Sequence, residues 1–357
     1  PLTWAVLVFT AQVFSAPTFK RGVNIDNWLS QNDASMPYAA AWFDEEDVAW
    51  IAAQGFDHLR IPIDSRIWLK PDGTLDEAKV APFDRALGWV KKHHLGAILD
   101  VHFLDGADFN SGERSDVRLF TDPVLLEKAA RLWRTLATRY TQEGDYLRFE
   151  LLNEPKAEQN AQLNVFSLRM LAVIRESNPT RVVYFPVNKW NTIPNIGDVE
   201  LPANDPNVAV TVHFYEPIIF THQRAPWVFA VEDQMPVVPF PGTVPDLTAT
   251  LQSMPAELRA HYPLKGTTLS VEHEIEARFA PLVAWSQGKG AGREILLGEF
   301  GVFFKADAAS TINWTRAVRQ LCERHGFGWA VWGYQSVFPV RQKDGSPAPM
   351  LEGLMKN

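Results

Sequence analysis

The stretch LRFELLNEP, residues 147–155, shows the pattern from which the fold of this chain can be predicted. Four of its first six residues are apolar, as is typical of a buried β-strand. A polar turn, Asn153-Glu154-Pro155, follows, and an amphipathic run typical of a helix covers residues 159–176. A strand, a polar turn and a helix together form the repeating unit of a parallel α/β protein.

The same unit recurs along the chain in both directions from this stretch. Asp44 precedes a run of acidic residues, and Thr121-Asp122-Pro123 places a proline at a first helical position, so both mark helix starts. A doubly wound sheet is the alternative, but no Gly-x-Gly-x-x-Gly turn follows the first strand. The pattern therefore predicts a (β/α)8 TIM barrel. Its eight strands are expected at residues 19–25, 57–63, 97–102, 147–152, 182–186, 208–214, 294–298 and 327–332.

The chain is longer than a minimal barrel. A typical barrel needs about 250 residues, so about 80–100 of the 357 residues are expected in insertions and tails. The longest gap between predicted strands is residues 216–293, after strand six. Its first part is rich in proline, and helical stretches are predicted at residues 247–261 and 271–285. We find no linker and no internal repeat, so residues 17–357 are predicted to form one catalytic domain.

The N-terminal segment differs from the rest of the chain. Residues 4–14 are almost wholly apolar, and Ser15, Ala16 and Pro17 follow. This is typical of the hydrophobic part and cleavage region of a secretory signal, although a short buried strand or helix is the alternative. We expect residues 1–16 to be the remnant of a signal and the protein to be secreted or periplasmic. Other segments fall short of the length needed to span a membrane.

Composition excludes several classes of protein. The chain has 34 Lys and Arg against 42 Asp and Glu, a net charge of −8, and no run of basic residues. It therefore has no electrostatic reason to bind nucleic acid or an anionic membrane. Its one cysteine, Cys322, rules out an internal disulfide framework. The 13 Trp and 22 Phe indicate either a heavily packed core or a surface that stacks flat ligands such as sugars.

Two glutamates stand at the ends of predicted strands on opposite sides of the barrel. Glu154 follows strand four and Glu299 follows strand seven, and catalytic groups of barrel enzymes lie at such C-terminal strand ends. Alone, Glu154 could cap a turn and Glu299 could pair with a cation. A pair of carboxyls across a cleft suits glycosidic bond cleavage, in which one protonates the leaving oxygen and the other attacks the anomeric carbon. In a retaining enzyme the two carboxyl groups lie about 5–5.5 Å apart.

The motifs at these strand ends, taken in order, resemble glycoside hydrolase family 5, the cellulase-type retaining β-glycosidases. They are Gly22-Val23-Asn24, Leu59-Arg60-Ile61-Pro62, Leu99-Asp100-Val101-His102, Asn153-Glu154-Pro155, His213-Phe214-Tyr215, Gly298-Glu299-Phe300-Gly301 and Trp332-Gly333. The resemblance implies an acid/base role for Glu154 and a nucleophile role for Glu299. It also implies that Arg60 holds the nucleophile ionised, Asn153 binds the sugar 2-hydroxyl, His213 and Tyr215 position the carboxyls, His102 contacts the sugar and Trp332 stacks on it.

The chain departs from the family pattern at one position. Many relatives carry a second histidine after the one matched by His102, but Phe103 stands here, so that subsite is expected to differ. Trp190, after strand five, is a further candidate for stacking on sugar, and Trp28 and Trp227 are weaker ones.

The predicted activity is that of an endo-β-1,4-glucanase acting by double displacement on a β-glucan, as a monomer and without a metal or organic cofactor. A β-mannanase, a β-1,3-glucanase or a xyloglucanase would use the same residues. A metal-dependent barrel hydrolase is another alternative, but it would want His-x-His where Val23-Asn24-Ile25 stands. A non-catalytic sugar-binding barrel would be expected to lack one of the two glutamates. The long insertion is predicted to shape one end of the cleft.

Overall fold

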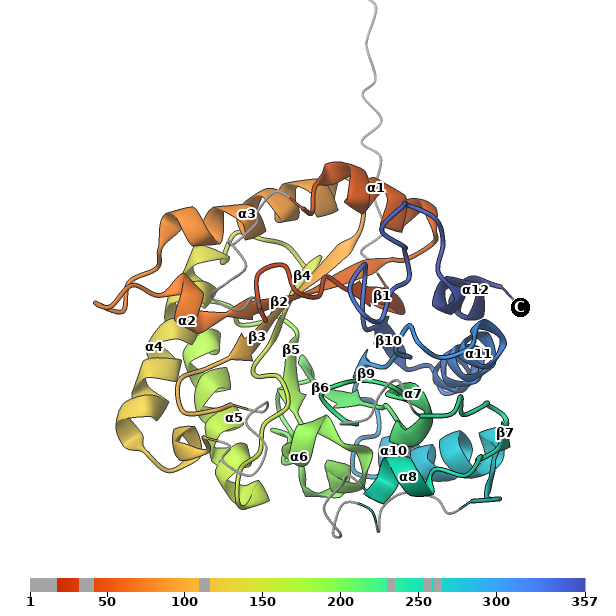
Figure 1. Ribbon diagram of the computed structural model, residues 1–357. Coiled ribbons are helices and arrows are strands. Elements are labelled where there is room, and N and C mark those ends of the chain that lie inside the picture. Colours follow the sequence, from red (N-terminus) through yellow and green to blue (C-terminus); the bar gives the residue numbers. More distant parts are fainter. Residues whose placement is uncertain are drawn as a thin grey trace, which may run out of the picture.

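A computed structural model of the chain describes residues 18–31, 42–108, 116–229, 235–252, 259 and 265–356. Eight parallel strands close into a barrel, and helices surround it, as predicted (Figure 1). The order around the barrel is β1-β10-β9-β6-β5-β4-β3-β2. The strands are β1 (Arg21–Asn24), β2 (His58–Asp64), β3 (Gly96–Phe103), β4 (Leu147–Glu150), β5 (Val183–Pro186), β6 (Val208–His213), β9 (Ile295–Glu299) and β10 (Gly328–Val331).

The long helices form the outer layer, and shorter helices lie in the loops. The predicted N-caps are confirmed: the Asp44 carboxylate accepts hydrogen bonds from the backbone N–H groups of Glu46 and Asp47, and Asp122 accepts one from Val124. The helices around the barrel are α1 (Glu45–Ala53), α2 (Ser65–Trp68), α3 (Glu77–Lys92), η2 (Arg118–Phe120), α4 (Pro123–Arg139), α5 (Asn160–Arg175), α6 (Asn188–Asn191), η3 (Ile193–Asp198), α11 (Ala308–Arg324) and α12 (Pro349–Met355).

The interior of the barrel differs between the N-terminal and the C-terminal ends of its strands. Near the N-terminal ends of the strands, Phe19, Ile98, Tyr184 and Leu296 form a small buried cluster. Further along β3, Asp100 and His102 follow Ile98 at alternate positions, so their side chains lie on the same face of the strand. The charged groups of the site therefore lie towards the C-terminal rim, while at the opposite end the Arg148 guanidinium stacks on Phe19 at 3.6 Å and pairs with Glu294.

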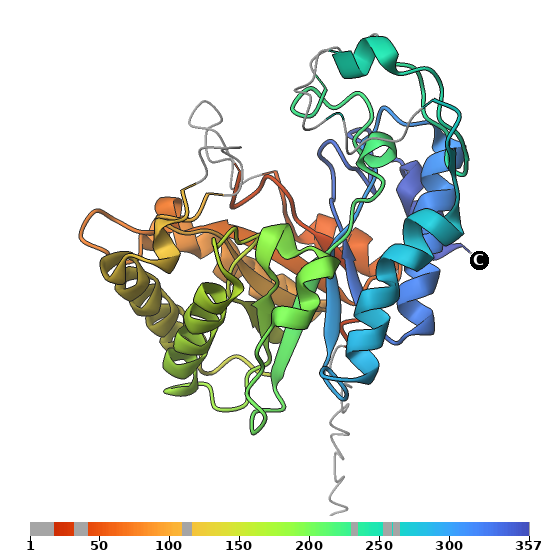
Figure 2. The same ribbon diagram turned by 90° about the horizontal axis from the view of Figure 1, so that it is seen from below.

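The predicted insertion after β6 is present and rises beyond the rim at which the strands end (Figure 2). Its two short strands pair antiparallel, and its helix predicted at residues 271–285 is found as a π-helical turn that continues into α10. The helix predicted at residues 247–261 is described only in its first part. The elements are α7 (Ile218–Thr221), β7 (Gly242–Thr243), α8 (Thr248–Gln252), β8 (Thr268–Leu269), η5 (Glu272–Glu276) and α10 (Ala277–Gln287).

Two further predictions concern membrane-spanning helices and the N-terminal signal. Within the described ranges, the helices are all too short or too polar to cross a lipid bilayer. The proposed signal, residues 1–16, lies outside the described residues.

Candidate active site

The predicted site residues gather at the C-terminal rim, where they line one cavity of about 1090 Å³. Arg60 is the exception, because it is fully buried beneath the cavity floor. The cavity also receives side chains from the insertion, so the insertion forms part of its wall. The predicted residues that line it are His102, Asn153, Glu154, Trp190, His213, Tyr215, Glu299 and Trp332.

Glu154 and Glu299 meet across this cavity. A carboxylate oxygen of each, together with a ring nitrogen of His213, lies within 4.8 Å of the others. This is the close spacing that a retaining glycosidase requires, about 5–5.5 Å between carboxyl groups. Glu154 has a φ of 43°, in the left-handed region that few residues other than glycine adopt. Such backbone strain persists where the surrounding structure enforces it, often at functional sites.

The surroundings of Glu154 favour its protonated form. The Nδ1 atom of His213 lies 2.9 Å from the Glu154 carboxylate, and Nε2 of the same ring lies 3.2 Å from the amide nitrogen of Asn191. Because the Asn191 amide donates to Nε2, the proton of a neutral ring is on Nδ1, where it holds the Glu154 carboxyl group in place. This hydrogen bond alone favours the carboxylate, so the protonated form depends on burial and on the charge of Glu299. Burial raises the pKa of Glu154 well above its ordinary value, and the charge of Glu299 raises it further. Burial also lowers the pKa of His213, which keeps its ring neutral.

Glu299 has partners that suit a carboxylate. The Nη1 group of Arg60 donates to one oxygen at 2.8 Å, and the Tyr215 hydroxyl donates to the other at 3.0 Å. Burial raises the pKa of Glu299, but the Arg60 guanidinium and the Tyr215 hydrogen bond oppose this rise. Among the described residues, Glu154 forms no ion pair with a lysine or an arginine, and its partner is the His213 ring. The environments therefore separate the two carboxyls into an acid and a base.

Arg60 is held by acids that the sequence analysis did not assign to the site. Its guanidinium makes a bidentate pair with Glu150, at 2.7 and 2.8 Å, and lies 3.1 Å from Asp100. It also donates to Asn24 and Asn153, at 2.8 and 2.9 Å. One buried cation thus faces three carboxyl groups, those of Glu150, Asp100 and Glu299. Burial raises the pKa of Asp100 to about 7, and the charge of the Arg60 guanidinium opposes this rise.

His102 is fixed by its neighbours on three sides. Its Nδ1 atom lies 2.7 Å from Asp100, and its ring is parallel to that of Trp332 at a centroid distance of 5.6 Å. Asn153 approaches Nε2 at 3.4 Å. Burial lowers the pKa of His102 to about 3, so the ring is neutral at ordinary pH. With Nδ1 directed at Asp100, Nε2 lies on the side of Asn153, which lines the cavity together with His102.

The other aromatic candidates separate into exposed and buried ones. Trp190 is 42% exposed, lines the cavity and lies under the Lys156 ammonium at 4.4 Å from the ring centroid. Trp227 is 57% exposed and also lines the cavity. The proposal for Trp28 is wrong, because its side chain is 1% exposed and packs against Phe43 in the core. Phe103, at the position of the missing histidine, is buried beneath the guanidinium of Arg66.

Asp26 lies behind the loop that follows β10 and was also missed. Its carboxylate accepts a hydrogen bond from the backbone N–H of Tyr334 at 2.7 Å and another from the Ser336 hydroxyl. The side chain is fully buried, and burial raises its pKa to about 7. Asp26 therefore holds the loop that leads from Trp332.

The missed residues lie beneath or beside the cavity and hold other residues of the site. Asn24, Asp100 and Glu150 lie within strands, and Asp26 lies in the loop after β1. Asn24 and Asp100 were quoted in the family motifs, but neither was given a role. A charged residue inside an otherwise apolar strand is the signal that could have found Asp100 and Glu150, since a buried charge requires a partner.

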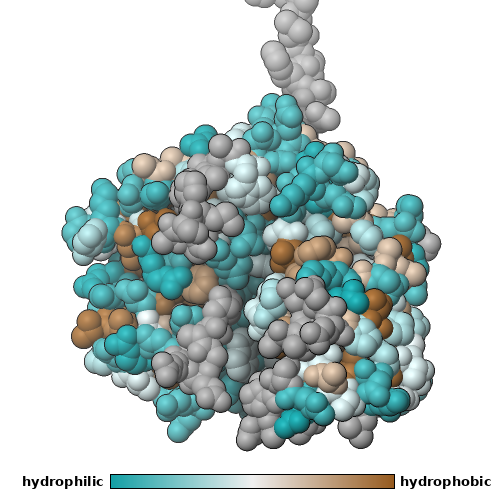
Figure 3. Space-filling model, in the orientation of Figure 1, coloured by the Kyte–Doolittle hydropathy of each residue, from teal (hydrophilic) through white to brown (hydrophobic). Residues whose placement is uncertain are grey.

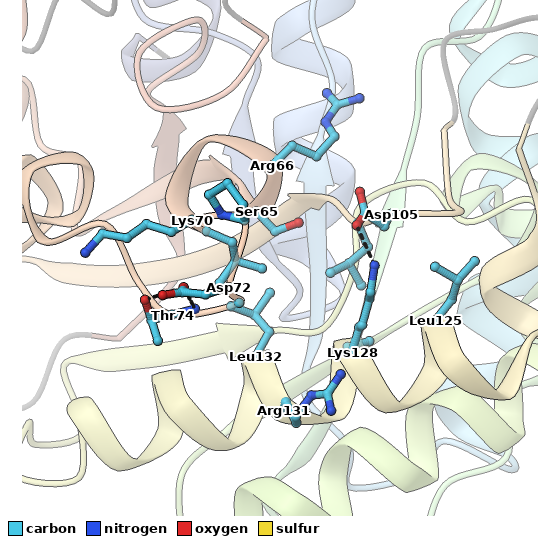
Figure 4. A pocket seen from close by; sticks show the side chains of 15 residues that line it. Ser65, Arg66, Lys70, Asp72, Thr74, Asp105, Leu125, Lys128, Arg131 and Leu132 are labelled. Carbon is cyan, nitrogen blue, oxygen red and sulfur yellow. Dashed lines mark hydrogen bonds and ion pairs between the residues drawn. The ribbon is translucent and has the colours of Figure 1, made fainter.

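A second depression lies outside the carboxylate pair, on the β2 and β3 side of the barrel (Figure 4). It has a volume of about 710 Å³ and is lined by charged side chains from α2, the loop after it and α4. Lys128 pairs with Asp105 at 3.7 Å, and Asp72 accepts a hydrogen bond from Thr74. Its lining includes no aromatic residue and no pair of facing carboxylates, so it lacks the features of the first cavity.

The cluster of Glu154, His213 and Glu299 also has the spacing of a metal site. The hydrogen bonds argue against that use, because the Nδ1 proton of His213 is directed at Glu154 and a metal ligand would need that nitrogen free. Arg60 further places a positive charge directly on Glu299. The donor set therefore suits proton transfer better than metal binding.

Known proteins resemble the chain over nearly its whole length. The family model described as Cellulase (glycosyl hydrolase family 5) matches residues 22–336. Endoglucanase C of Acetivibrio thermocellus is 31% identical over 338 residues, covering 92% of this chain and 95% of the relative. Cellodextrinase A of Ruminococcus flavefaciens is 28% identical, covering 86% of this chain and 82% of the relative.

Solved structures agree with these matches. Thermotoga maritima Cel5A, solved in complex with cellobiose, superposes with a TM-score of 0.71 at 26% identity, covering 94% of this chain and 97% of that one. The same enzyme has been solved with a mannotriose substrate, with a TM-score of 0.72 at 26% identity, covering 95% and 98% of the two chains. From the barrel, the carboxylate pair and these matches together, the chain belongs to glycosyl hydrolase family 5, the cellulase family.

Proposed function

We propose that the protein is an endo-acting β-1,4-glucanase that retains the configuration of the anomeric carbon. The observation that carries this proposal is the pairing of Glu154 and Glu299 within 4.8 Å, with His213 on the first and Arg60 on the second. The endoglucanase relatives support the choice of β-glucan as substrate.

In the first step, the Glu299 carboxylate attacks the anomeric carbon and forms a covalent glycosyl ester. Glu154 gives its proton to the glycosidic oxygen, so the C–O bond breaks and the leaving sugar departs as an alcohol. The raised pKa of Glu154 keeps that proton in place until the substrate binds. Arg60 and Tyr215 orient Glu299 by holding both of its oxygens.

In the second step, Glu154 is a carboxylate and takes a proton from a water molecule. The water oxygen attacks the anomeric carbon, the ester bond to Glu299 breaks, and Glu299 leaves as a carboxylate. Two inversions at the same carbon give net retention. Esterification of Glu299 removes its negative charge, which lowers the pKa of Glu154 and suits its change from acid to base.

The test is a panel of soluble polysaccharides: carboxymethylcellulose, barley β-glucan, glucomannan, galactomannan, laminarin and xyloglucan. Product sizes resolved by chromatography distinguish internal cleavage from release of short units at chain ends, and NMR of fresh products reports the anomer. We expect intermediate-length β-anomeric products from the β-1,4-glucans. Initial release of the α-anomer, or of a single small sugar only, would contradict the proposal.

A β-mannanase is the second candidate, because Thermotoga maritima Cel5A has been solved with mannotriose. Faster cleavage of galactomannan than of any glucan would favour it. Activity that disappears in EDTA and returns with a divalent metal would favour a metal-dependent hydrolase instead. Binding of oligosaccharides without release of reducing ends would point to a non-catalytic barrel.

We also propose that the protein is exported, on the basis of the apolar residues 4–14 and the small residues Ser15 and Ala16. N-terminal sequencing of the protein recovered from culture medium or periplasm should begin shortly after Ala16. Recovery of the chain from the cytoplasm with residues 1–16 intact would contradict export.

A further inference from the structure

In the described part of the chain, the most exposed aromatic side chains lie in or beside the cleft. Among the described residues, the exposed large apolar side chains include three aromatic ones, Trp190, Trp227 and Phe304. Trp190 and Trp227 line the active-site cavity. Phe304 does not line it, but its backbone N–H donates to the carbonyl of Val337, which does. The exposed rings are therefore placed with respect to the cleft and are not scattered over the surface.

Trp227 and Phe304 come from different segments but pack on the same buried ring, that of Phe303. Trp227 belongs to the insertion, and Phe304 lies in the loop after β9. Both rings meet the buried ring of Phe303 edge to face, at centroid distances of 5.1 Å for Trp227 and 4.7 Å for Phe304. The backbone N–H of Phe303 donates to the carbonyl of Thr221 at 2.7 Å, which fixes this residue to α7. The two exposed rings are thus held in place from beneath.

This arrangement leaves apolar surface in water without an evident structural benefit. Trp227 and Phe304 are each 57% exposed, and the neighbouring Val337 is 38% exposed. Apolar patches appear on both sides of the face seen in Figure 3, so exposure alone does not mark this site and its position beside the cavity does. Exposed apolar surface that is rigid and continuous with a cleft is typical of a binding site. Because the patch around Trp227 continues into the active-site cavity, we expect its ligand to be the same chain that occupies the cleft.

We propose that Trp227 and Phe304 form a distal platform for a sugar residue of the glucan chain, outside the residues held at the carboxylate pair. A β-linked glucan presents flat faces of C–H groups, because its ring hydroxyls are equatorial, and these faces pack on aromatic rings. The platform rests on the proposed function, since it assumes that the chain in the cleft is a β-glucan. The second depression, which has a charged lining and no aromatic residue, offers no such surface.

The test compares long and short substrates in the full-length protein. Phe304→Ala should lower kcat/KM for cellohexaose and carboxymethylcellulose about 2- to 10-fold, the effect of losing one aromatic contact. It should leave kcat/KM for an aryl β-cellobioside unchanged, because that substrate is too short to reach the platform. Phe304→Tyr, which keeps the ring, should behave like the unchanged protein. Trp227→Ala should likewise weaken binding of cellohexaose.

Val165→Ala on α5 is the matched control, because Val165 is 60% exposed and lies away from the cleft. Equal losses on long and short substrates, or no loss on either, would overturn the platform. If a partner protein occupied this surface instead, kcat/KM on every glucan would be unchanged in these variants. That result would also overturn the platform.

Calorimetry separates this proposal from the proposed function. Cellohexaose is titrated into Glu299→Gln and into the same variant carrying Phe304→Ala. Weaker binding in the double variant supports the platform, and equal binding, or none in either, overturns it. Absence of cleavage of every glucan by the unchanged protein would instead contradict the proposed function, whatever the calorimetry shows.

Discussion

The Nη1 group of Arg60 lies 2.8 Å from the Glu299 carboxylate, while the opposing Glu154 has a neutral histidine as its nearest partner. This asymmetry assigns the two carboxyls different work, although they are alike in chemistry and are close in space. Substitutions of Glu299 and Glu154 test that assignment. Substitutions of Glu150 and Asp26 test the buried acids near the site.

Glu299→Gln should lower kcat on β-glucans on the order of 10⁴-fold or more, because an amide cannot form the covalent ester. The change is nearly isosteric, so thermal unfolding should remain cooperative. Rates of reducing-end release measure the loss. Glu276→Gln, at an exposed glutamate on η5, is the control and should keep full activity. Substantial turnover by purified Glu299→Gln would contradict the assignment of the nucleophile.

Glu154→Gln should lower turnover of polysaccharide about 10²–10⁴-fold, the usual contribution of a general acid. The first step should stay fast on 2,4-dinitrophenyl β-cellobioside, because its leaving group needs no proton. The second step still lacks its base, so a burst of one dinitrophenolate per enzyme should precede slow turnover in stopped-flow measurements. An equal loss of the first step on both substrates would show that Glu154 is not the acid.

Glu150→Gln should change the pH dependence of activity. Arg60 would then be shared among fewer carboxylates, so the pKa of Glu299 should fall and the acid limb of the kcat/KM profile should move to lower pH. Loss of one partner from a buried pair also destabilises, by about 3–5 kcal/mol. Thermal unfolding measures the second effect. An unchanged acid limb would show that Glu150 supports the fold alone.

Asp26→Asn should flatten the pH dependence of stability between about pH 4 and pH 7. The pKa of Asp26 rises from an ordinary 3.8 to about 7 in the folded protein, so the folded state binds an extra proton between these values. Rising pH therefore removes stability over this window, by up to about 1.4 kcal/mol per pH unit, and removes no more above about pH 7.

Urea unfolding at half-unit pH intervals measures this slope. Asp100 is raised to about 7 as well, so the variant should retain part of the dependence. Asp246→Asn, at an exposed acid in the insertion, should leave the slope between pH 4 and pH 7 unchanged. A slope in Asp26→Asn as steep as in the unchanged protein would contradict the raised pKa.

Much of the barrel was predictable because its signals are local. A buried parallel strand is an almost continuous apolar run, so strands such as residues 183–186 and 208–213 were found within a few residues of their ends. Caps such as Asp44 act within one helical turn. The short strands β7 and β8 were missed, because two-residue strands carry no periodicity.

The site was predictable where a residue lies at the rim or matches a family motif, and was missed where the role of a residue depends on contacts made across the closed barrel. Glu154 and Glu299 were found because barrel enzymes carry catalytic groups at that rim. Glu150 and Asp100 gain meaning only when the closed barrel brings both against Arg60, 90 residues and 40 residues along the chain from it. Trp28 shows the converse, because only packing could tell a buried tryptophan from an exposed one.

The insertion leaves the barrel after β6 and returns at β9, and these two strands are direct neighbours. The two strands are parallel, so the insertion leaves at the C-terminal rim after His213, and α10 carries the chain back to the opposite end of the barrel before Ile295. A wall of different length or shape at the rim therefore leaves the pairing of β6 with β9 in place. Substrate preference could then diversify quickly while the chemistry of the barrel is inherited unchanged.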